Sequence, residues 1–193
     1  MSNVLMILGS RNPDGQTATA AEALADGCRS AGATVDAVYL PQKQLERCRQ
    51  CDDDGWGLCR RGDSCVIDDD LAPLMEAMSD ADLVVVATPV YFGDLSESMK
   101  ALLDRVRRVA VNRADSNPLV DKPCVGIAVA GGGGGGSFSC LYSLERILQT
   151  CGFRIVDQVS VRRQNMELKR QVLRQTGVWL VENLNSSPTQ RGR

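Results

Sequence analysis

The sequence predicts an α/β fold in which a doubly wound, five-stranded parallel sheet lies between two layers of helices. Short apolar runs alternate with longer amphipathic stretches five times along the 193 residues, the pattern of repeated strand–helix units. Right-handed crossovers then favour the strand order 2-1-3-4-5, whose switch point lies between the first and third strands. The length suits one domain over residues 1–184, with a cysteine-rich loop at 48–65 and a polar, disordered tail at 185–193.

The expected strands are short apolar runs bounded by glycines or polar residues. They cover Val4–Leu8, Thr34–Leu40, Leu83–Thr88, Cys124–Ala130 and Phe153–Val161. The expected helices carry apolar residues at helical spacing. They cover Thr17–Ala31, Asp69–Ser79, Ser96–Val111, Phe138–Cys151 and Glu167–Leu184. The loops that follow the first, third and fourth strands should therefore meet at the switch point, where such sheets bind ligands.

Composition excludes several classes of function. The chain has no histidine, which rules out a Ser-His-Asp triad, a Cys-His pair and a His-ligated zinc hydrolase. A formal net charge of -2 gives no reason to expect a nucleic-acid partner. No apolar run approaches the roughly 20 residues that span a bilayer, and the first residues lack the basic start of a signal peptide. A cytoplasmic protein without a membrane partner is expected, with its chemistry supplied by thiols, carboxylates or a cofactor.

The first of the three loops runs from Gly9 to Thr17. Ser10 and Thr17 offer hydroxyl groups, and the loop opens a helix whose free N–H groups and positive dipole end attract a phosphate. It is neither a Walker loop nor the G-x-G-x-x-G fingerprint. The alternative is an ordinary turn between a strand and a helix.

The other two loops favour a flat, aromatic ligand. After the third strand, Pro89 stiffens a turn in which Tyr91 and Phe92 present apolar surface, although both could simply pack against the next helix. After the fourth strand comes the run of six glycines Gly131–Gly136. Its backbone donors could line a ligand edge with no side chains in the way, whereas a flexible linker makes little sense inside a strand–helix unit.

Taken together, these motifs resemble the flavodoxin-like NAD(P)H-dependent FMN oxidoreductases, especially the branch related to iron–sulfur flavoproteins. Gly9-Ser10 and Gly15-Gln16-Thr17 match the opening motif of that family in spacing, and Pro89-Val90-Tyr91-Phe92 matches its proline–tyrosine turn. The resemblance implies that the FMN phosphate is held by Ser10, Arg11, Asn12, Gly15, Gln16 and Thr17. It also implies that the isoalloxazine is flanked by Pro89, Val90, Tyr91, Phe92, Gly93, Gly131, Gly132 and Gly133.

The eight cysteines fall into two sets. Cys28, Cys124, Cys140 and Cys151 are scattered over expected helices and strands and should be buried, inert thiols. The other four follow the pattern C-x2-C-x7-C-x5-C at Cys48, Cys51, Cys59 and Cys65. Four thiolates in one loop suit a [4Fe-4S] cluster or a tetrahedral zinc ion, and a loop without metal remains the third alternative. The iron–sulfur flavoproteins have two residues between the second and third cysteines, where this chain has the seven residues 52–58.

Two charged runs near this loop have simpler interpretations. The arginines Arg105, Arg107, Arg108 and Arg113 are expected on a solvated helix face. Asp68 or Asp69 is expected to cap the following helix and complement its dipole.

The function expected from these features is an oxidoreductase in which FMN takes hydride from NAD(P)H and passes electrons to an unknown acceptor. No side chain is expected to act as a general acid or base. The rival classes are a flavodoxin-type electron carrier without NAD(P)H activity and a zinc-stapled module without flavin. A homodimer or homotetramer is expected, because flavin sites in similar proteins often lie at subunit interfaces.

Overall fold

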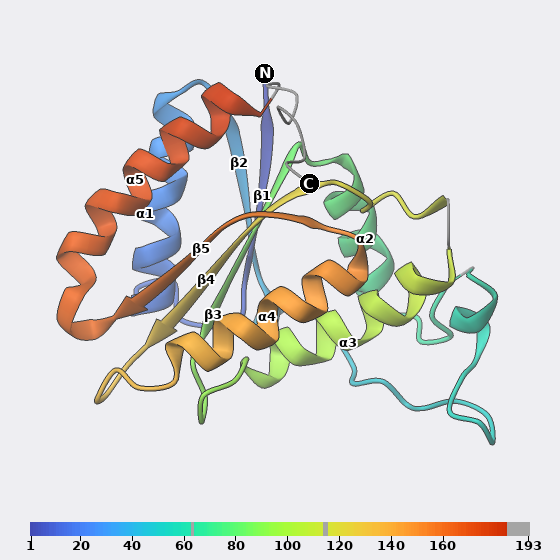
Figure 1. Ribbon diagram of the computed structural model, residues 1–193. Coiled ribbons are helices and arrows are strands. Elements are labelled where there is room, and N and C mark those ends of the chain that lie inside the picture. Colours follow the sequence, from blue (N-terminus) through green and yellow to red (C-terminus); the bar gives the residue numbers. More distant parts are fainter. Residues whose placement is uncertain (63, 114–115, 185–193) are drawn as a thin grey trace, which may run out of the picture.

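The computed structural model describes residues 1–62, 64–113 and 116–184, and the tail expected at 185–193 lies outside these ranges. All five strands pair in parallel in the predicted order, β2-β1-β3-β4-β5 (Figure 1). Their bounds are Asn3–Leu8 for β1, Thr34–Tyr39 for β2, Leu83–Pro89 for β3, Pro123–Ala130 for β4 and Arg154–Arg162 for β5. The fold is therefore flavodoxin-like, as the sequence predicts.

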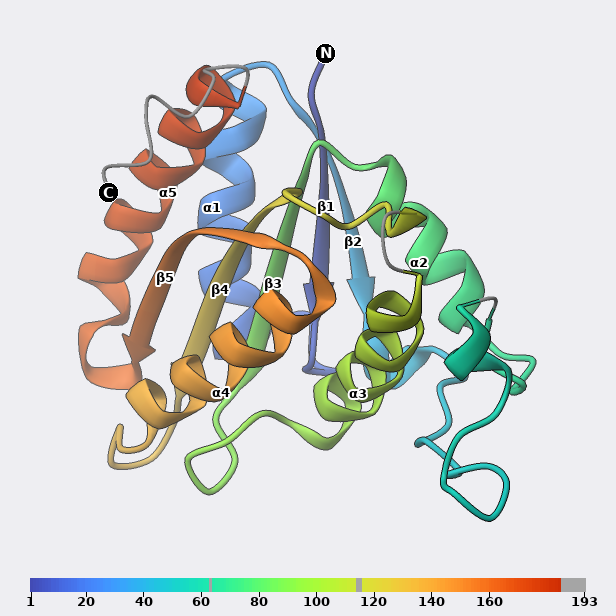
Figure 2. The same cartoon turned by 45° about the vertical axis from the view of Figure 1, so that its right-hand side comes forward.

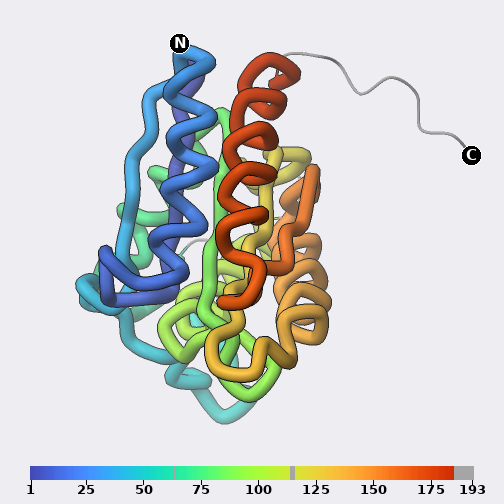
Figure 3. The backbone as a smooth tube through the Cα atoms, turned by 90° about the vertical axis from the view of Figure 1, so that its left-hand side faces the viewer, coloured from blue at the N-terminus to red at the C-terminus, as the bar shows by residue number. Residues whose placement is uncertain are grey.

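Helices cover both faces of the sheet. Helices α1 (Gln16–Ser30) and α5 (Met166–Asn183) lie side by side on one face, as Figure 3 shows. Helices α2 (Leu71–Asp80), α3 (Glu97–Asn112) and α4 (Ser137–Cys151) cover the other (Figure 1). Among the described residues, no helix is both long and apolar enough to cross a membrane.

The strands are apolar on both faces because both faces are covered. Along β1, Leu5 and Ile7 pack toward α2, α3 and α4, whereas Val4, Met6 and Leu8 pack toward α1 and α5. β3 and β4 alternate in the same way, and every residue from Leu83 to Thr88 is buried. This two-sided core explains why the strands appear in the sequence as continuous apolar runs.

Two glycines allow α1 and α5 to approach each other closely. A Cβ added at Gly27 would lie 2.0 Å from the carbonyl oxygen of Arg174, and one added at Gly177 would lie 2.2 Å from that of Leu24. The Cys28 thiol donates to the Gly177 carbonyl at the same crossing, at 3.6 Å. The contact thus places backbone against backbone.

The helix α2 begins slightly later than expected, at Leu71. Asp69 does accept a hydrogen bond from the Leu71 backbone N–H, at 3.2 Å, as a capping residue would. Asp70 occupies the N-cap position, but its carboxylate accepts from the Gln44 N–H at 2.7 Å. The acidic run therefore anchors the preceding loop as well as the helix.

The interpretation of the arginine run as a solvated face is wrong for Arg105. Its side chain is 1% exposed and forms an ion pair with Asp69, which is 6% exposed. The helical pattern places Arg105 on the buried side of α3, between Leu102 and Val109. Its burial is possible because a carboxylate from another segment meets it there.

Candidate functional site

The three loops singled out in the sequence lie at the same end of the sheet, beyond the carboxyl ends of β1, β3 and β4 (Figure 2). Hydrogen bonds join the first loop to β3 and to α3. The Gly9 N–H donates to the Ala87 carbonyl at 2.8 Å, and the Ser98 hydroxyl donates to the Gly9 carbonyl at 3.2 Å. Behind them, the buried Thr88 hydroxyl accepts from the Ser96 N–H at 3.1 Å. A Cβ at Gly9 would lie 2.4 Å from the Ser96 hydroxyl oxygen, so only glycine allows this close approach. The sequence did not indicate that Thr88, Ser96 and Ser98 hold the first loop in place.

The first loop leaves its donors unused. α1 begins at Gln16, and the N-cap residue Gly15 has no side chain to cap it. Asn12 shapes the turn, since its side chain accepts from the Asp14 N–H at 3.0 Å and its carbonyl accepts from the Gly15 N–H at 3.2 Å. Within the described chain, the Ser10 and Thr17 hydroxyls have no partner. The first-turn N–H groups of the helix point to the same end. This arrangement suits an anion such as a phosphate.

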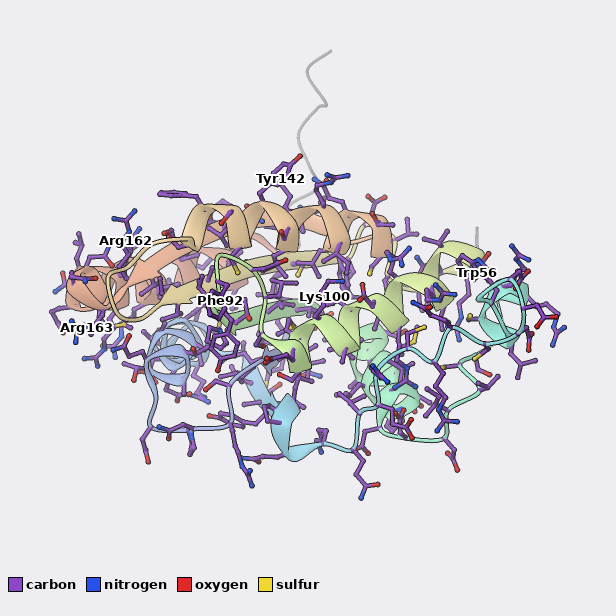
Figure 4. All side chains as sticks on the ribbon, turned by 90° about the horizontal axis from the view of Figure 1, so that it is seen from below. Trp56, Phe92, Lys100, Tyr142, Arg162 and Arg163 are labelled. Carbon is purple, nitrogen blue, oxygen red and sulfur yellow. The ribbon has the colours of Figure 1, made fainter. Side chains whose placement is uncertain are left out.

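The second loop is a tight turn that carries an exposed aromatic ring. Tyr91 and Asp94 exchange backbone hydrogen bonds of 2.9 and 3.0 Å. The two residues between them have positive φ angles, 50° at Phe92 and 82° at Gly93. A positive φ is unfavourable for a bulky residue, yet the Phe92 side chain is fully exposed and gains no packing in return. Figure 4 marks Phe92 on this loop. Strain of this kind favours a ligand-contacting role.

The glycine loop after β4 is folded and tied to its neighbours. The Gly134 N–H donates to the Gly131 carbonyl at 2.8 Å, and the Gln164 side chain donates to the Gly132 carbonyl at 3.0 Å. Gly136 lies against the second loop, since an added Cβ would be 2.6 Å from the Cα of Gly93. A Cβ at Gly131, Gly132 or Gly133, in contrast, would meet no atom of the described residues within 4 Å. These three residues therefore border open space at the site.

The four loop cysteines line one small cavity, between the segment after β2 and helix α3. All four are partly buried. Among the described residues, however, no three cysteine, aspartate or glutamate side chains are placed to hold a metal ion. The structure therefore brings Cys48, Cys51, Cys59 and Cys65 to one cavity without the convergence of a formed metal centre.

Arg105 forms one wall of this cavity. Its two terminal nitrogens donate to the two carboxylate oxygens of Asp69, at 2.6 and 2.9 Å, and one of them also donates to the Glu46 carbonyl at 3.0 Å. Burial alone would raise the pKa of Asp69, but the hydrogen bonds from Arg105 and from backbone N–H groups outweigh it and hold that pKa below its usual value. The ion pair thus fastens the cysteine loop to α3.

The seven residues between Cys51 and Cys59 form a compact turn. The Asp54 carboxylate accepts from the Trp56 N–H at 3.0 Å and pairs with Arg60. The guanidinium of Arg108 lies 4.0 Å from the centre of the Trp56 ring and donates to the Gly55 carbonyl. Of the three aspartates in this segment, Asp54 is thus paired with an arginine, and Arg108 holds the turn through the Gly55 carbonyl and the Trp56 ring.

The remaining cysteines are buried, as predicted. Burial raises the pKa of Cys28 to about 11 and the pKa of Cys140 and of Cys151 to about 12, and it also raises the pKa of Cys124. Since the thiolate is the reactive form, these four thiols are inert near neutral pH.

A thiol reagent should distinguish the two sets of cysteines. At pH 8, native protein treated with an aromatic disulfide reagent should react rapidly at no more than the four loop cysteines, and denatured protein at all eight. Mass spectrometry of the digested protein identifies the modified residues. Rapid modification of Cys140 or Cys151 in native protein would contradict the buried placement.

Comparisons with known proteins agree with this architecture. The profile of the NADPH-dependent FMN reductase family matches residues 2–166. An iron–sulfur flavoprotein of Methanosarcina thermophila is 31% identical over 125 residues, which make up 65% of this chain and 61% of that protein. One of Methanocaldococcus jannaschii is 29% identical over 129 residues, 67% of this chain and 64% of that protein. The matched region is thus under two thirds of either relative. The NAD(P)H:quinone oxidoreductase from Methanothermobacter marburgensis has the same fold, with a TM-score of 0.70 at 16% identity over 99% of this chain and 100% of that one.

The strand order and the loops at the switch point define a flavodoxin-like protein. The match over residues 2–166 shows that the chain belongs to the NADPH-dependent FMN reductase family, which confirms the resemblance noted in the sequence.

Proposed function

We propose that the chain is an FMN-dependent oxidoreductase that uses NAD(P)H. The observation that carries this proposal is that three loops converge at one end of the sheet. The first has unused hydrogen-bond donors, the second has a strained and exposed aromatic residue, and the third has glycine backbone beside open space. FMN bound there supplies the redox chemistry, in which hydride is taken from NAD(P)H and electrons leave to an acceptor.

Each loop has a distinct task under this proposal. The N–H groups that begin α1, with the hydroxyls of Ser10 and Thr17, bind the phosphate. Tyr91 and Phe92 offer apolar surface to the flavin ring. The backbone of Gly131–Gly133 lets the ring edge approach without side-chain obstruction, and its N–H groups favour the negative charge of the reduced ring. No side chain is required as a general acid or base.

The cysteine cavity would hold a second redox centre. Four thiolates are the ligand set of a [4Fe-4S] cluster, and the iron–sulfur flavoproteins named above are relatives of this chain. Helix α3 connects the two places, since Ser98 contacts the loop after β1 and Arg105 lines the cavity. These two residues are roughly 10 Å apart along the helix axis, from the rise per residue. A cluster held there would supply one-electron chemistry on the same helix that supports the first loop.

Thr17→Val tests the phosphate contact. Loss of one hydrogen bond to a charged group should weaken FMN binding about 10- to 100-fold. Riboflavin lacks the phosphate, so its affinity should stay nearly unchanged. Fluorescence titration of both flavins gives the two dissociation constants. The matched control is Thr19→Val. The Thr19 hydroxyl already donates to the Gly15 carbonyl, at 3.0 Å, so it is not available to a phosphate. An equal loss for both flavins would contradict the assignment.

Anaerobic stopped-flow mixing tests the reaction. Protein loaded with FMN should lose its flavin absorbance after mixing with NADPH or with NADH, and the faster of the two identifies the preferred donor. Failure of both to bleach the flavin would overturn the NAD(P)H-dependent function. A stable one-electron form on chemical titration would then favour the electron-carrier alternative.

A further inference from the structure

Two arginine side chains of α3 face the cysteine cavity, each with an unused hydrogen-bond donor. Arg105 and Arg108 both line the cavity beside the four cysteines. The Nε atoms of both residues are buried and have no hydrogen-bond partner. They are the buried side-chain nitrogen and oxygen atoms without a partner among the described residues. A buried donor without an acceptor is costly, so both atoms indicate that an acceptor belongs in this cavity.

The rest of each guanidinium is held in place by protein. The terminal nitrogens of Arg105 are used by Asp69 and by the Glu46 carbonyl. Arg108 is fixed by its donation to the Gly55 carbonyl and by its position over the Trp56 ring. Neither side chain can turn its Nε toward another partner without breaking these contacts. The two donors are therefore held in fixed positions on side chains that line the cavity.

Charge identifies the class of acceptor. Asp69 neutralises Arg105, but no carboxylate pairs with Arg108 among the described residues. Four thiolates around a [4Fe-4S] centre in its oxidised state carry a net charge of about -2, and one further electron makes the charge more negative. Hydrogen bonds to the sulfurs and nearby positive charge favour the more negative, reduced state.

We propose that a [4Fe-4S] cluster is bound by Cys48, Cys51, Cys59 and Cys65, and that Arg105 and Arg108 are its positioning residues. The Nε–H groups of these two arginines donate to the cluster sulfurs and raise the reduction potential of the cluster. The proposal rests on the proposed function, because it assumes the cluster in the cysteine cavity. It gives the buried Arg105 a role in addition to its ion pair with Asp69. It also explains why the insertion between Cys51 and Cys59 carries Trp56, which holds the second arginine.

The test measures the reduction potential of the cluster in Arg108 variants. Full-length protein is reconstituted anaerobically with ferrous iron and sulfide, its iron and sulfide contents are determined, and the cluster is titrated with an electrode while its EPR signal is followed. Arg108→Gln should lower the ratio of reduced to oxidised cluster about tenfold at a given potential, which is about 59 mV for one electron. Arg108→Lys keeps the charge and should show a smaller shift. The control Arg107→Gln removes a charge from the same helix outside the cavity lining and should leave the potential unchanged.

The other possible results of this experiment also support or overturn the proposal. A cluster lost from Arg108→Gln but kept in Arg108→Lys would support the proposal, because the charge is then required. Loss from both variants, an unchanged potential in Arg108→Gln, or an equal shift in the Arg107 control would overturn it. Uptake of zinc in place of iron and sulfide by the unaltered protein would also overturn it. The FMN dissociation constant and bleaching by NADPH are measured on the same samples, so failure of the flavin function is seen separately from failure of this proposal.

Discussion

Arg105→Met should lower the free energy of unfolding by about 3–5 kcal/mol, since it leaves the buried Asp69 carboxylate without its partner. Methionine replaces most of the apolar stem, so lost packing contributes little. Asp69→Asn should have a similar effect, because the Arg105 charge then stays buried without a counter-charge. Urea unfolding followed by circular dichroism measures both changes.

The matched control for this ion pair is Asp68→Asn. Asp68 is adjacent in sequence but exposed, and its change should stay within about 0.5 kcal/mol. If Asp68→Asn lowered the free energy of unfolding as much as Asp69→Asn, the buried ion pair would contribute no more to stability than an exposed carboxylate.

The same pair gives stability a pH dependence. The pKa of Asp69 is lower in the folded protein than its ordinary value of 3.8. The unfolded chain therefore binds the proton more readily, and the stabilisation is complete above pH 3.8 and is lost as the pH falls through the folded pKa. The difference in stability between the original protein and Asp69→Asn should shrink on acidification below that pH.

Gly27→Ala should lower the free energy of unfolding by about 3 kcal/mol. Helix propensity alone predicts the opposite sign, a gain of roughly 1 kcal/mol for alanine over glycine. The steric term should win because the new methyl group would lie 2.0 Å from the Arg174 carbonyl oxygen, and backbone cannot move aside as a flexible side chain can. Helices α1 and α5 would have to separate.

Thermal and urea unfolding of Gly27→Ala, compared with Glu22→Ala on the exposed side of α1, measure this effect. Glu22 pairs with Arg29 at the surface, where ion pairs contribute 0–1 kcal/mol. A Gly27→Ala protein as stable as the original would show that the two helices do not meet at this distance.

The sequence predicts the fold well because each apolar run has a single interpretation. Val4–Leu8 and Leu83–Thr88 are too short for helices and too apolar for exposed strands, so they indicate a covered parallel sheet. Gly32 and Gly152 mark helix ends, and the structure gives them φ angles of 89° and 106°. Strand order follows from crossover handedness rather than from any residue.

The candidate site is less visible in the sequence. Its loops can be located, but the close approach of Gly9 to the Ser96 and Thr88 hydroxyls depends on the packing of β1 against the loop after β3. The prediction that Arg105 lies on a solvated face is wrong because a charged residue in a helix normally indicates exposure to solvent. Its partner Asp69 lies 36 residues away in the chain, so the sequence does not indicate the ion pair. Likewise, nothing local distinguishes Gly27 from other helical glycines, since its neighbour Gly177 belongs to the last helix. Contacts between residues distant in sequence account for the omissions at Arg105 and Gly27.

The most direct test of the central claim is the visible absorption spectrum of anaerobically purified protein, recorded before and after incubation with FMN and gel filtration. We expect the paired absorption bands of bound flavin, approaching one FMN per chain after incubation. Protein that stays colourless after incubation with FMN would contradict the assignment of the three loops as a flavin site.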